Sequence, residues 1–575
     1  MTFLHRGKGR RGVAALLTAG SLMAFQALSI VGAVSASASG TCTYNPATDT
    51  LNVTVDATTL STLGVDSVTH SIELDGVACG SATNSNTVAI VVLGQPSSAE
   101  TLVLDNTDEE FNTAIAWAID LGTNVLPLVD VFQIDLNDDT DNALILTDIS
   151  FDLNGGGGEL NGVEEIDVNG GDGDDTIDGS AMVAVMLVAD GGAGDDWIAP
   201  GKFAGDLITG GADSDTVSYG TRTTCIVIDN TLVIGSGADA NCDGDSLDVG
   251  DEGDSLVDAL EVLESGSGND TLIGGAGDET FIPGDGDDDI TGGGGTDTLD
   301  YSSSSAAMTI DPAAGTAVGQ GSDTFASIEA FVGSDFDDVL IWDGSTTQFS
   351  GGAGVDTVDA SAETSGQEIN LGAAALDCSG ITPFTPGDDV ENVIGGSGSD
   401  TICGNVLGNV LTGGDGNDTI LGFGGNDKIE GGLGNDNMDG GAGADTLSFV
   451  NAPSGEDIDN QLGFATGGDG EDSIAFFEII LGSDFADTIV AGQNAFSLNQ
   501  RVKGRGGNDN ITGSSSSDTL RGGGGKDVIR AGPGDDNLAG GAGNDLLVGG
   551  KGFDFGRGGK GKDICRGVEV TRSCR

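Results

Sequence analysis

Basic residues and histidine are scarce in this chain. Its 575 residues include 20 Lys and Arg and 2 His against 93 Asp and Glu, which gives a formal net charge of −73. Residues 41–500 alone hold 3 basic and 84 acidic residues. Such a segment repels nucleic acids and anionic membranes and attracts cations. We therefore expect no nucleic-acid partner, and a bound divalent cation is the simplest way to neutralise the acids.

The shortage of histidine excludes several kinds of active site. The chain has no HExxH motif for a zinc protease and no GxSxG motif for a lipase. Apart from His5 in the N-terminal leader, the one histidine is His70, which stands in an ordinary strand pattern, SVTHSIEL. Paired carboxylates could still serve a glycosidase, but acids are so abundant that no pair is informative. We expect this protein not to be an enzyme.

Cysteine is limited to eight residues without a CxxC pair, which argues against a zinc site. An even number of cysteines in an exported chain favours disulfides, although the sequence alone does not fix their connectivity. Pairing between sequence neighbours is our working hypothesis. The neighbouring couples are Cys42/Cys79, Cys225/Cys242, Cys378/Cys403 and Cys565/Cys574.

Long apolar runs are also few. The run at residues 13–34 follows a basic stretch that ends at Arg11, and it precedes the small-residue cleavage pattern at residues 36–38. We interpret residues 1–38 as a signal peptide and not as a membrane anchor, because the run is rich in Ala, Gly and Ser and contains Gln26. The mature chain is therefore expected to be secreted, without a transmembrane segment.

Glycine, in contrast, is abundant, and much of it belongs to an internal repeat of nine residues such as GGDGNDTIL at 413–421. Six copies follow one another at 395–448, seven at 504–566 and four at 265–300. Four single copies bring the number to 21. Position 6 is acidic in 20 of the 21 copies, and position 8 is large and apolar in 19. A flexible linker would not keep an apolar residue in register. The single copies begin at Gly170, Gly191, Gly210 and Gly351.

Each position of the repeat has a physical role. Glycines at positions 1, 2 and 4 permit positive φ and a tight turn whose carbonyl oxygens converge. The acid at position 6 adds a carboxylate to these carbonyls, and Ca²⁺ takes six to eight such oxygens. Positions 7 to 9 predict a strand of about three residues with position 8 pointing inward. Two copies then form one coil, and stacked coils form two parallel sheets around a continuous core.

The pattern GGxGxDxUx, in which U is a large apolar residue, closely resembles the RTX (haemolysin-type) calcium-binding repeat family. The resemblance extends over about residues 160–566 and implies a bacterial protein with a parallel β-roll, Ca²⁺ in the turns and an extracellular location. The expected fold class is all-β: a β-solenoid of nonapeptides with β-rich excursions and an N-terminal β-rich cap domain. Pore-forming members of the family have a long apolar region before the repeats, which this chain lacks.

The expected calcium ligands are the acids at position 6. Each acid is shared between copies n and n+2, so a run of n copies offers about n − 2 sites, or roughly 11 Ca²⁺ ions in the three runs. The predicted ligands are Asp175, Asp196, Asp215, Asp270, Glu279, Asp288, Asp297, Asp356, Asp400, Asp418, Asp427, Asp436, Asp445, Asp509, Asp518, Asp527, Asp536, Asp545, Asp554 and Asp563.

Between the runs the chain makes short β-rich excursions and resumes the repeat through a recurring pattern with a glutamate. These glutamates cap a coil edge, bind Ca²⁺ or are simply exposed at the edge. They are Glu261, Glu329, Glu391 and Glu478.

The predicted division of the chain follows these patterns. Residues 41–160 have strand patterns, with a short helix expected at 111–121, and form a β-sandwich or an irregular start to the solenoid. The segments are 1–38 (signal peptide), 41–160 (N-terminal β-rich domain of unknown role), 161–300 (β-roll with an excursion), 301–448 (excursions and β-roll), 449–503 (excursion) and 504–575 (β-roll with a cap).

The C-terminal run differs in charge, since residues 501–575 hold 13 basic and 9 acidic residues. Local charge balance and docking to an anionic cell-surface polymer or glycan are the two interpretations. A disulfide between Cys565 and Cys574 would fold Val568 and Val570 over the open end of the roll. We expect a secreted calcium-binding protein with a structural or interaction role. The alternative is a calcium-stabilised hydrolase or lyase, or an adhesin, with its active part in 41–160.

Overall fold

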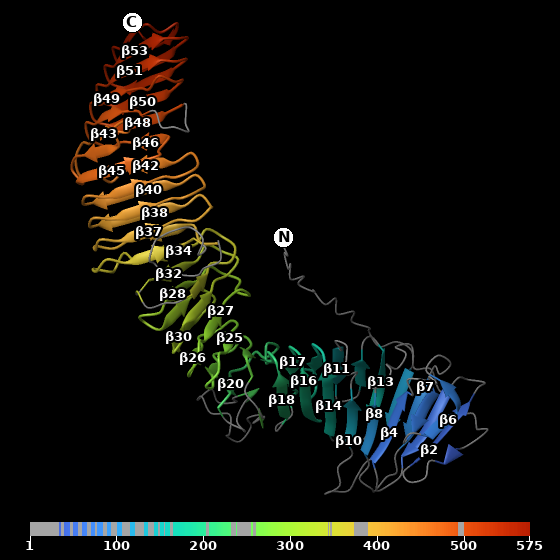
Figure 1. The fold of residues 1–575 in the computed structure, drawn as a ribbon. Helices are drawn as coiled ribbons and strands as arrows, with labels where there is room; N and C mark the ends of the chain where they lie inside the picture. Colours follow the sequence, from blue (N-terminus) through green and yellow to red (C-terminus); the bar gives the residue numbers. More distant parts are fainter. Residues whose placement is uncertain are drawn as a thin grey trace.

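The computed structural model is a long all-β solenoid (Figure 1). It describes residues 165–183, 185–202, 206–231, 260–342, 344, 348–372, 389–492 and 499–574. In the rest of the chain it describes separate strands, mostly by their backbone alone. Its strands form four sheets of 16, 9, 19 and 12 strands, and within the described part of the chain the structure contains no helix. No described segment could therefore cross a membrane as an apolar helix.

The strands coincide with the end of each nonapeptide, as the sequence predicts. β39 (Thr419–Leu421) covers positions 7 to 9 of its copy, and the side chain of Ile420 at position 8 is fully buried. Other strands, such as β38 (Val410–Asp415), continue into the first three residues of the next copy. Residues at positions 7 and 9 face outward, because side chains alternate between the two faces of a strand.

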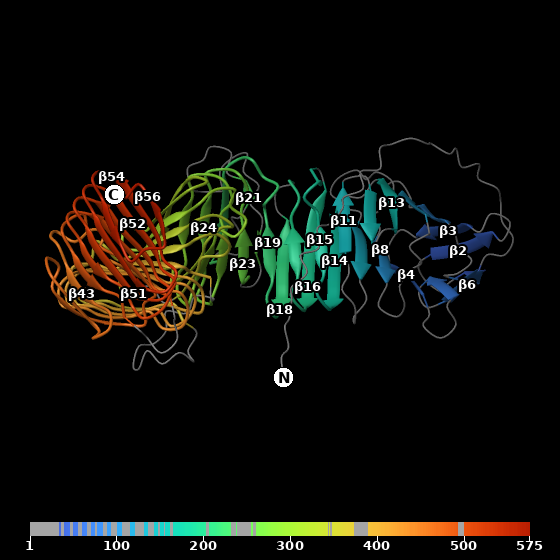
Figure 2. The ribbon, with the colours of Figure 1, turned by 90° about the horizontal axis from the view of Figure 1, so that it is seen from above.

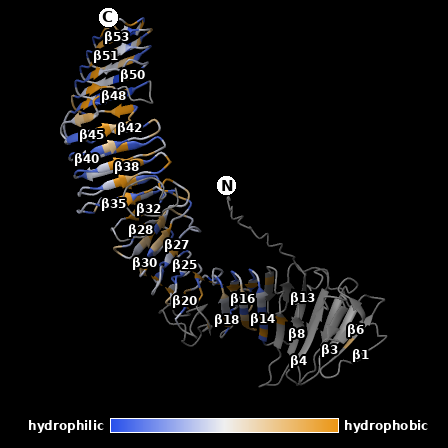
Figure 3. Ribbon diagram, viewed as in Figure 1, coloured by the Kyte–Doolittle hydropathy of each residue, from blue (hydrophilic) through white to orange (hydrophobic). Residues whose placement is uncertain are grey.

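The register confirms two copies per coil. β24 (Thr271–Ile273) pairs in parallel with β26 (Asp289–Thr291), and Leu272 lies opposite Ile290 two copies further on. Copies of odd and even number thus form two sheets, and Figure 2 shows the two sheets facing one another in the C-terminal half. Their position-8 side chains form a continuous apolar core. In Figure 3 hydrophobic and hydrophilic residues alternate along the ribbon of the roll.

The excursions are β-hairpins inserted into a sheet. In the first, β28 (Thr309–Asp311), β29 (Thr316–Val318) and β30 (Ser322–Ala326) pair antiparallel to one another. β30 also pairs in parallel with β26, and β28 pairs with β32 (Val339–Ile341), so the hairpin widens the 19-stranded sheet without interrupting it. The second excursion repeats this arrangement in the 12-stranded sheet with β43 (Asp457–Asp459), β44 (Phe464–Thr466) and β45 (Glu471–Ala475).

The described strands of the N-terminal segment join the same sheets as the first repeats. β8 (Thr101–Asp105), β10 (Val131–Asp135) and β14 (Glu165–Asp172) pair in parallel and lead directly into the first repeats. The prediction of a helix at 111–121 is wrong, because these residues include β9 (Ala116–Asp120). β9 pairs in parallel with β7 (Ala89–Leu93), and such tertiary pairing overrides local helix propensity.

The C-terminal end is closed by a short tail. The predicted disulfide between Cys565 and Cys574 is present, and both cysteines pack against the core. Val568 covers Gly556, which stands at an inward position where other copies have a large side chain. The prediction that Val570 also covers the end is wrong: Val570 is 37% exposed, because β56 (Val570–Arg572) extends the 19-stranded sheet and turns this side chain outward.

The other predicted disulfides are tested in part. Cys42, Cys225 and Cys403 are disulfide-bonded. Their predicted partners, Cys79, Cys242 and Cys378, lie outside the residues whose side chains the structure describes.

Candidate calcium site

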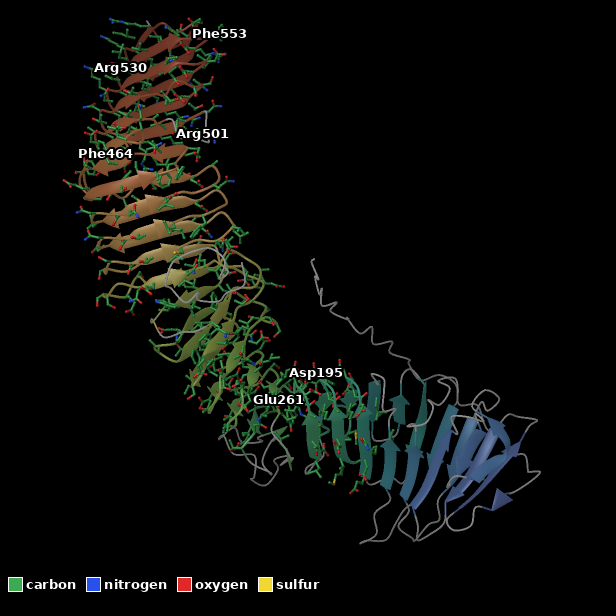
Figure 4. All side chains as sticks on the ribbon, viewed as in Figure 1. Asp195, Glu261, Phe464, Arg501, Arg530 and Phe553 are labelled. Carbon is green, nitrogen blue, oxygen red and sulfur yellow. A yellow bond between two sulfur atoms is a disulfide. The ribbon has the colours of Figure 1, made fainter. Side chains whose placement is uncertain are left out.

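The acids at position 6 form buried ladders along the turns of the roll. In the run at 395–448, the backbone N–H of Asp418 donates to Oδ1 of Asp436 at 2.9 Å, and the N–H of Asp427 donates to Oδ1 of Asp445 at 2.9 Å. Each ladder therefore joins acids two copies apart, on the same side of the roll. All twenty predicted ligands stand in such turns, and none is more than 3% exposed. Figure 4 draws all the side chains along the roll and labels Asp195, the sequence neighbour of the ladder acid Asp196.

The second carboxylate oxygen has a different environment. In sixteen of the twenty acids it is buried and accepts no hydrogen bond. Burying a carboxylate oxygen without a hydrogen-bond donor costs on the order of several kcal/mol, because the oxygen loses its hydration and gains no partner. The sixteen are Asp196, Asp270, Glu279, Asp288, Asp297, Asp356, Asp418, Asp427, Asp436, Asp445, Asp509, Asp527, Asp536, Asp545, Asp554 and Asp563.

Backbone oxygens converge on the same place. A Cβ atom added to Gly422, at position 1 of its copy, would collide with Oδ2 of Asp427 and with the carbonyl oxygen of Gly440 two copies further on. Position 1 is therefore glycine because a side chain would fill the space beside the unpaired oxygen. Glycines at positions 2 and 4, such as Gly414 and Gly416, have φ of 108° and 140°, which orients the turn carbonyls and disfavours other residues.

Burial makes several of these acids hard to ionise without a cation. Desolvation raises the pKa of Asp418, Asp427 and Asp509 from 3.8 to about 7, and the pKa of Asp288 to about 8. Neighbouring acids of the ladder contribute in the same direction, since like charges repel. A divalent cation between the turns would offset both effects, because it supplies the missing partner of the second oxygen.

The donor set fits Ca²⁺ better than a softer metal. Within the described residues, no three His, Cys, Asp or Glu side chains gather closely enough to hold a metal by themselves. A cation in a turn would thus be held by one or two carboxylates and by backbone carbonyls. Hard oxygen ligands in a flexible backbone frame are typical of calcium sites.

The structure adds acids that the repeat count missed. Asp206, Asp338 and Asp487 stand at position 6 of copies that lack glycine at positions 2 and 4, which is why the pattern did not reveal them. Asp323 and Asp472 enter the ladder where the two hairpins return to the roll. Their signal in the sequence is the apolar residue two positions later.

The four glutamates of the return pattern also belong to the ladders. Oε2 of Glu261 accepts the N–H of Asp215, and Oε2 of Glu329 accepts the N–H of Asp297, where an aspartate of the next coil would otherwise accept. The strand register places these glutamates at the position equivalent to position 6, for example Glu261 in line with Asp215 and Glu329 in line with Asp297. Glu391, Glu478 and Glu569 make the equivalent bonds to Asp356, Asp445 and Asp554. They are ladder residues and not merely exposed edge carboxylates.

Three turns satisfy their own acid through a serine. In these copies position 2 is serine, and its N–H and hydroxyl both bond to the carboxylate at position 6. Ser483 N–H donates to Oδ2 of Asp487 at 2.8 Å, and its hydroxyl donates to Oδ1 at 2.7 Å. The other two pairs are Ser334 with Asp338 and Ser514 with Asp518. We call these three the serine turns, because their second oxygen is already occupied.

A β-roll that stacks two nonapeptides per coil, with buried acids in glycine turns, defines the calcium-binding β-solenoids. Comparison with protein families then identifies the repeats as RTX calcium-binding nonapeptide repeats, in groups of 4 copies, and no enzyme family is among the matches. The matched residues are 167–181, 264–299, 404–438, 412–447, 503–538, 522–556 and 530–565. A search of curated proteins finds no match to this chain.

Proposed function

We propose that this chain is a secreted protein whose glycine and aspartate turns coordinate many Ca²⁺ ions and thereby fold the roll outside the cell. The observation that carries the proposal is the row of buried carboxylate oxygens without a donor, next to converging backbone carbonyls. The predicted acids outside the serine turns would supply the side-chain ligands, and roughly ten or more ions would bind. The signal peptide that supports secretion lies in residues 1–38, outside the described part of the chain.

The bound ions would stabilise the folded roll in addition to its apolar core. At low Ca²⁺ the acids repel one another and the buried carboxylates are unfavourable. Millimolar Ca²⁺ binds only the folded turns, and a ligand that binds only the native state stabilises that state. A protein of this kind would be unfolded inside the cell, where free calcium is low, and would fold after export.

Far-UV circular dichroism of the mature chain in excess chelator and in millimolar Ca²⁺ tests the proposal, together with a calorimetric calcium titration. We expect a largely unfolded spectrum with chelator and a β spectrum with Ca²⁺. A full β signal in excess chelator would contradict it.

The alternative enzymatic or adhesive activity would reside in residues 41–160, whose side chains lie almost entirely outside the described part of the structure.

A further inference from the structure

The last five strands of the 19-stranded sheet present a basic outer face. They are β48 (Arg501–Gly506), β50 (Thr519–Gly524), β52 (Asn537–Ala542), β54 (Phe555–Lys560) and β56. The outward residues at positions 7 and 9 include five basic residues and no acid, in a chain that is strongly acidic elsewhere. These ten residues are Arg501, Lys503, Thr519, Arg521, Asn537, Ala539, Phe555, Arg557, Val570 and Arg572.

Four of the five basic residues, all except Arg501, stand in one column along the axis of the roll. The parallel register places Lys503 beside Arg521, Arg521 beside Ala539, Ala539 beside Arg557, and Arg557 beside Arg572. Neighbouring strands are about 4.8 Å apart, so Arg521 and Arg557 are separated by roughly 10 Å along the axis. A flat sheet with charges at this regular spacing matches an extended polyanion better than a compact one.

A hollow lies between these two arginines. It encloses about 730 Å³, within the range of small-ligand sites, and no acidic residue lines it. Small residues leave the space open: Ala539, Gly541 and Gly559 stand among the lining residues on adjacent strands. The remaining lining residues supply an aromatic face, amide and hydroxyl groups and further charge, and they are Thr519, Arg521, Asn537, Ala542, Phe555, Arg557, Lys560 and Ser573.

We propose that this hollow binds a segment of a linear acidic polysaccharide. Arginine pairs with carboxylates through two parallel hydrogen bonds, and Asn537 and Thr519 can bond to sugar hydroxyls. The half-buried ring of Phe555 offers a surface for the apolar face of a sugar. A polymer in which acidic and neutral sugars alternate presents carboxylates at a period comparable to the spacing of Arg521 and Arg557. Duplex nucleic acid fits less well, because its phosphates repeat at about 3.4 Å along each strand. That spacing is much closer than the roughly 10 Å between Arg521 and Arg557.

The opposite sheet provides a matched control. There β51 (Val528–Pro533), β53 (Leu546–Lys551) and β55 (Ile564–Arg566) place Arg530 beside Val548 and Val548 beside Arg566. Charge and spacing are the same as for Arg521, Ala539 and Arg557, but a larger valine stands between the arginines. Arg530 and Arg501, one from each sheet, are labelled in Figure 4. The comparison of the two pairs therefore separates a shaped site from mere positive charge.

The test is calorimetric titration of the calcium-loaded mature chain with a hyaluronan oligosaccharide, with uncharged dextran as the neutral probe. We expect hyaluronan to bind and dextran not to bind. Arg521→Gln with Arg557→Gln should weaken binding about tenfold or more, since each substitution removes a charge-assisted hydrogen bond to a carboxylate. Arg530→Gln with Arg566→Gln should change the affinity less than about twofold. Ala539→Val, which fills the hollow without changing the charge, should also abolish most of the binding.

Three results would overturn the inference: no binding of hyaluronan by the unmodified chain, equal losses in the two arginine pairs, or equally tight binding of a single-stranded DNA of the same charge. The inference rests on the proposed function only in requiring a calcium-folded roll. Circular dichroism and calcium titration of every variant distinguish failure of this inference from failure of the proposed function. A normal calcium response without saccharide binding removes this inference alone, whereas absence of the calcium response removes the proposed function.

Discussion

At the scale of the residue, the acid at position 6 has two separate tasks. One oxygen of Asp427 accepts the N–H of Asn409 at 2.8 Å and so holds neighbouring coils together. The other oxygen is buried without a donor and is available to a cation. An amide side chain retains the first oxygen but removes the charge that the cation needs. Exchange of aspartate for asparagine therefore separates the two tasks.

Asp427→Asn should remove one or two neighbouring calcium sites from the run at 395–448. If the lost site is normally filled at a hundred times its Kd, the free energy of unfolding in Ca²⁺ falls by about 2.7 kcal/mol. Calorimetric stoichiometry and denaturant unfolding in millimolar Ca²⁺ measure both effects. Asp285→Ala, at an exposed position 3, is the control and should leave both unchanged. Equal effects of the two substitutions would mean that Ca²⁺ forms a diffuse counter-ion cloud.

A few turns carry a side chain where the backbone favours glycine. Phe423 occupies position 2 of its copy with φ of 66°. Phe423→Gly should stabilise the calcium-bound protein by about 1 kcal/mol, because a non-glycine residue in the left-handed region costs of order 1–3 kcal/mol and glycine recovers only part of it. The midpoint of urea unfolding measures the change. Phe553, exposed and without positive φ, is the control, and Phe553→Gly should not stabilise.

At the scale of the element, most glycine-rich turns leave the second oxygen of their acid open, whereas three turns are closed by serine and the turn of Asp400 is closed by the N–H of Gly396. In the serine turns the position-2 residue donates hydrogen bonds to the second carboxylate oxygen, which a cation would otherwise contact. The inward apolar residue is present in both kinds of turn, but Ser334, Ser483 and Ser514 lack the positive φ that Gly414 and Gly416 have. The serine turns therefore preserve the coil without needing an ion, and we expect the calcium count to be lower than the number of copies suggests.

Ser514→Gly combined with Ser516→Gly should convert one serine turn into a calcium turn. The substitutions remove the donors to Asp518 and restore glycine at positions 2 and 4, so about one additional Ca²⁺ ion should bind. Calorimetry gives the stoichiometry. The same exchange at Ser515 and Ser517, positions 3 and 5, is the control and should add no ion. An unchanged stoichiometry in the first variant would show that the serine donors do not decide occupancy.

At the scale of the whole molecule, the buried acids link folding to pH. In the calcium-free protein the pKa of Asp418, Asp427 and Asp509 is raised by burial from 3.8 to about 7. The folded state then binds more protons than the unfolded state between these values. The resulting stability is fully present below pH 3.8 and is lost as the pH rises through about 7.

Acidification in excess chelator from about pH 8 to about pH 5 should therefore increase the β signal. In saturating Ca²⁺ the trend should reverse, because protons compete with the cation for the same oxygens. Circular dichroism across this range measures both. Repeating the chelator series in about 1 M salt, where surface charges are screened, isolates the buried acids, since their contribution should persist. Loss of β structure on acidification in chelator would contradict the prediction.

The sequence alone determined the coil, because each nonapeptide contains its turn, its carboxylate and its inward side chain. Glycine at positions 1, 2 and 4, the acid at 6 and the apolar residue at 8 act locally or on the next identical copy, so their spacing predicts their structure. The twenty acids were found in this way, and all are buried in turns. Copies with Ser and Phe at the glycine positions, such as the one around Asp487, lack that local signature and were missed.

Only the tertiary structure decided what depends on residues far apart in the chain. The hairpin β28–β30 enters the sheet through pairings with β26 and β32, which no local pattern specifies. The glutamates join the ladder because their coil lies against the previous one, and β9 is a strand because its neighbours on both sides are strands. The column of Arg521 and Arg557 around Ala539 likewise arises from register alone, since stacking brings residues eighteen apart in sequence side by side.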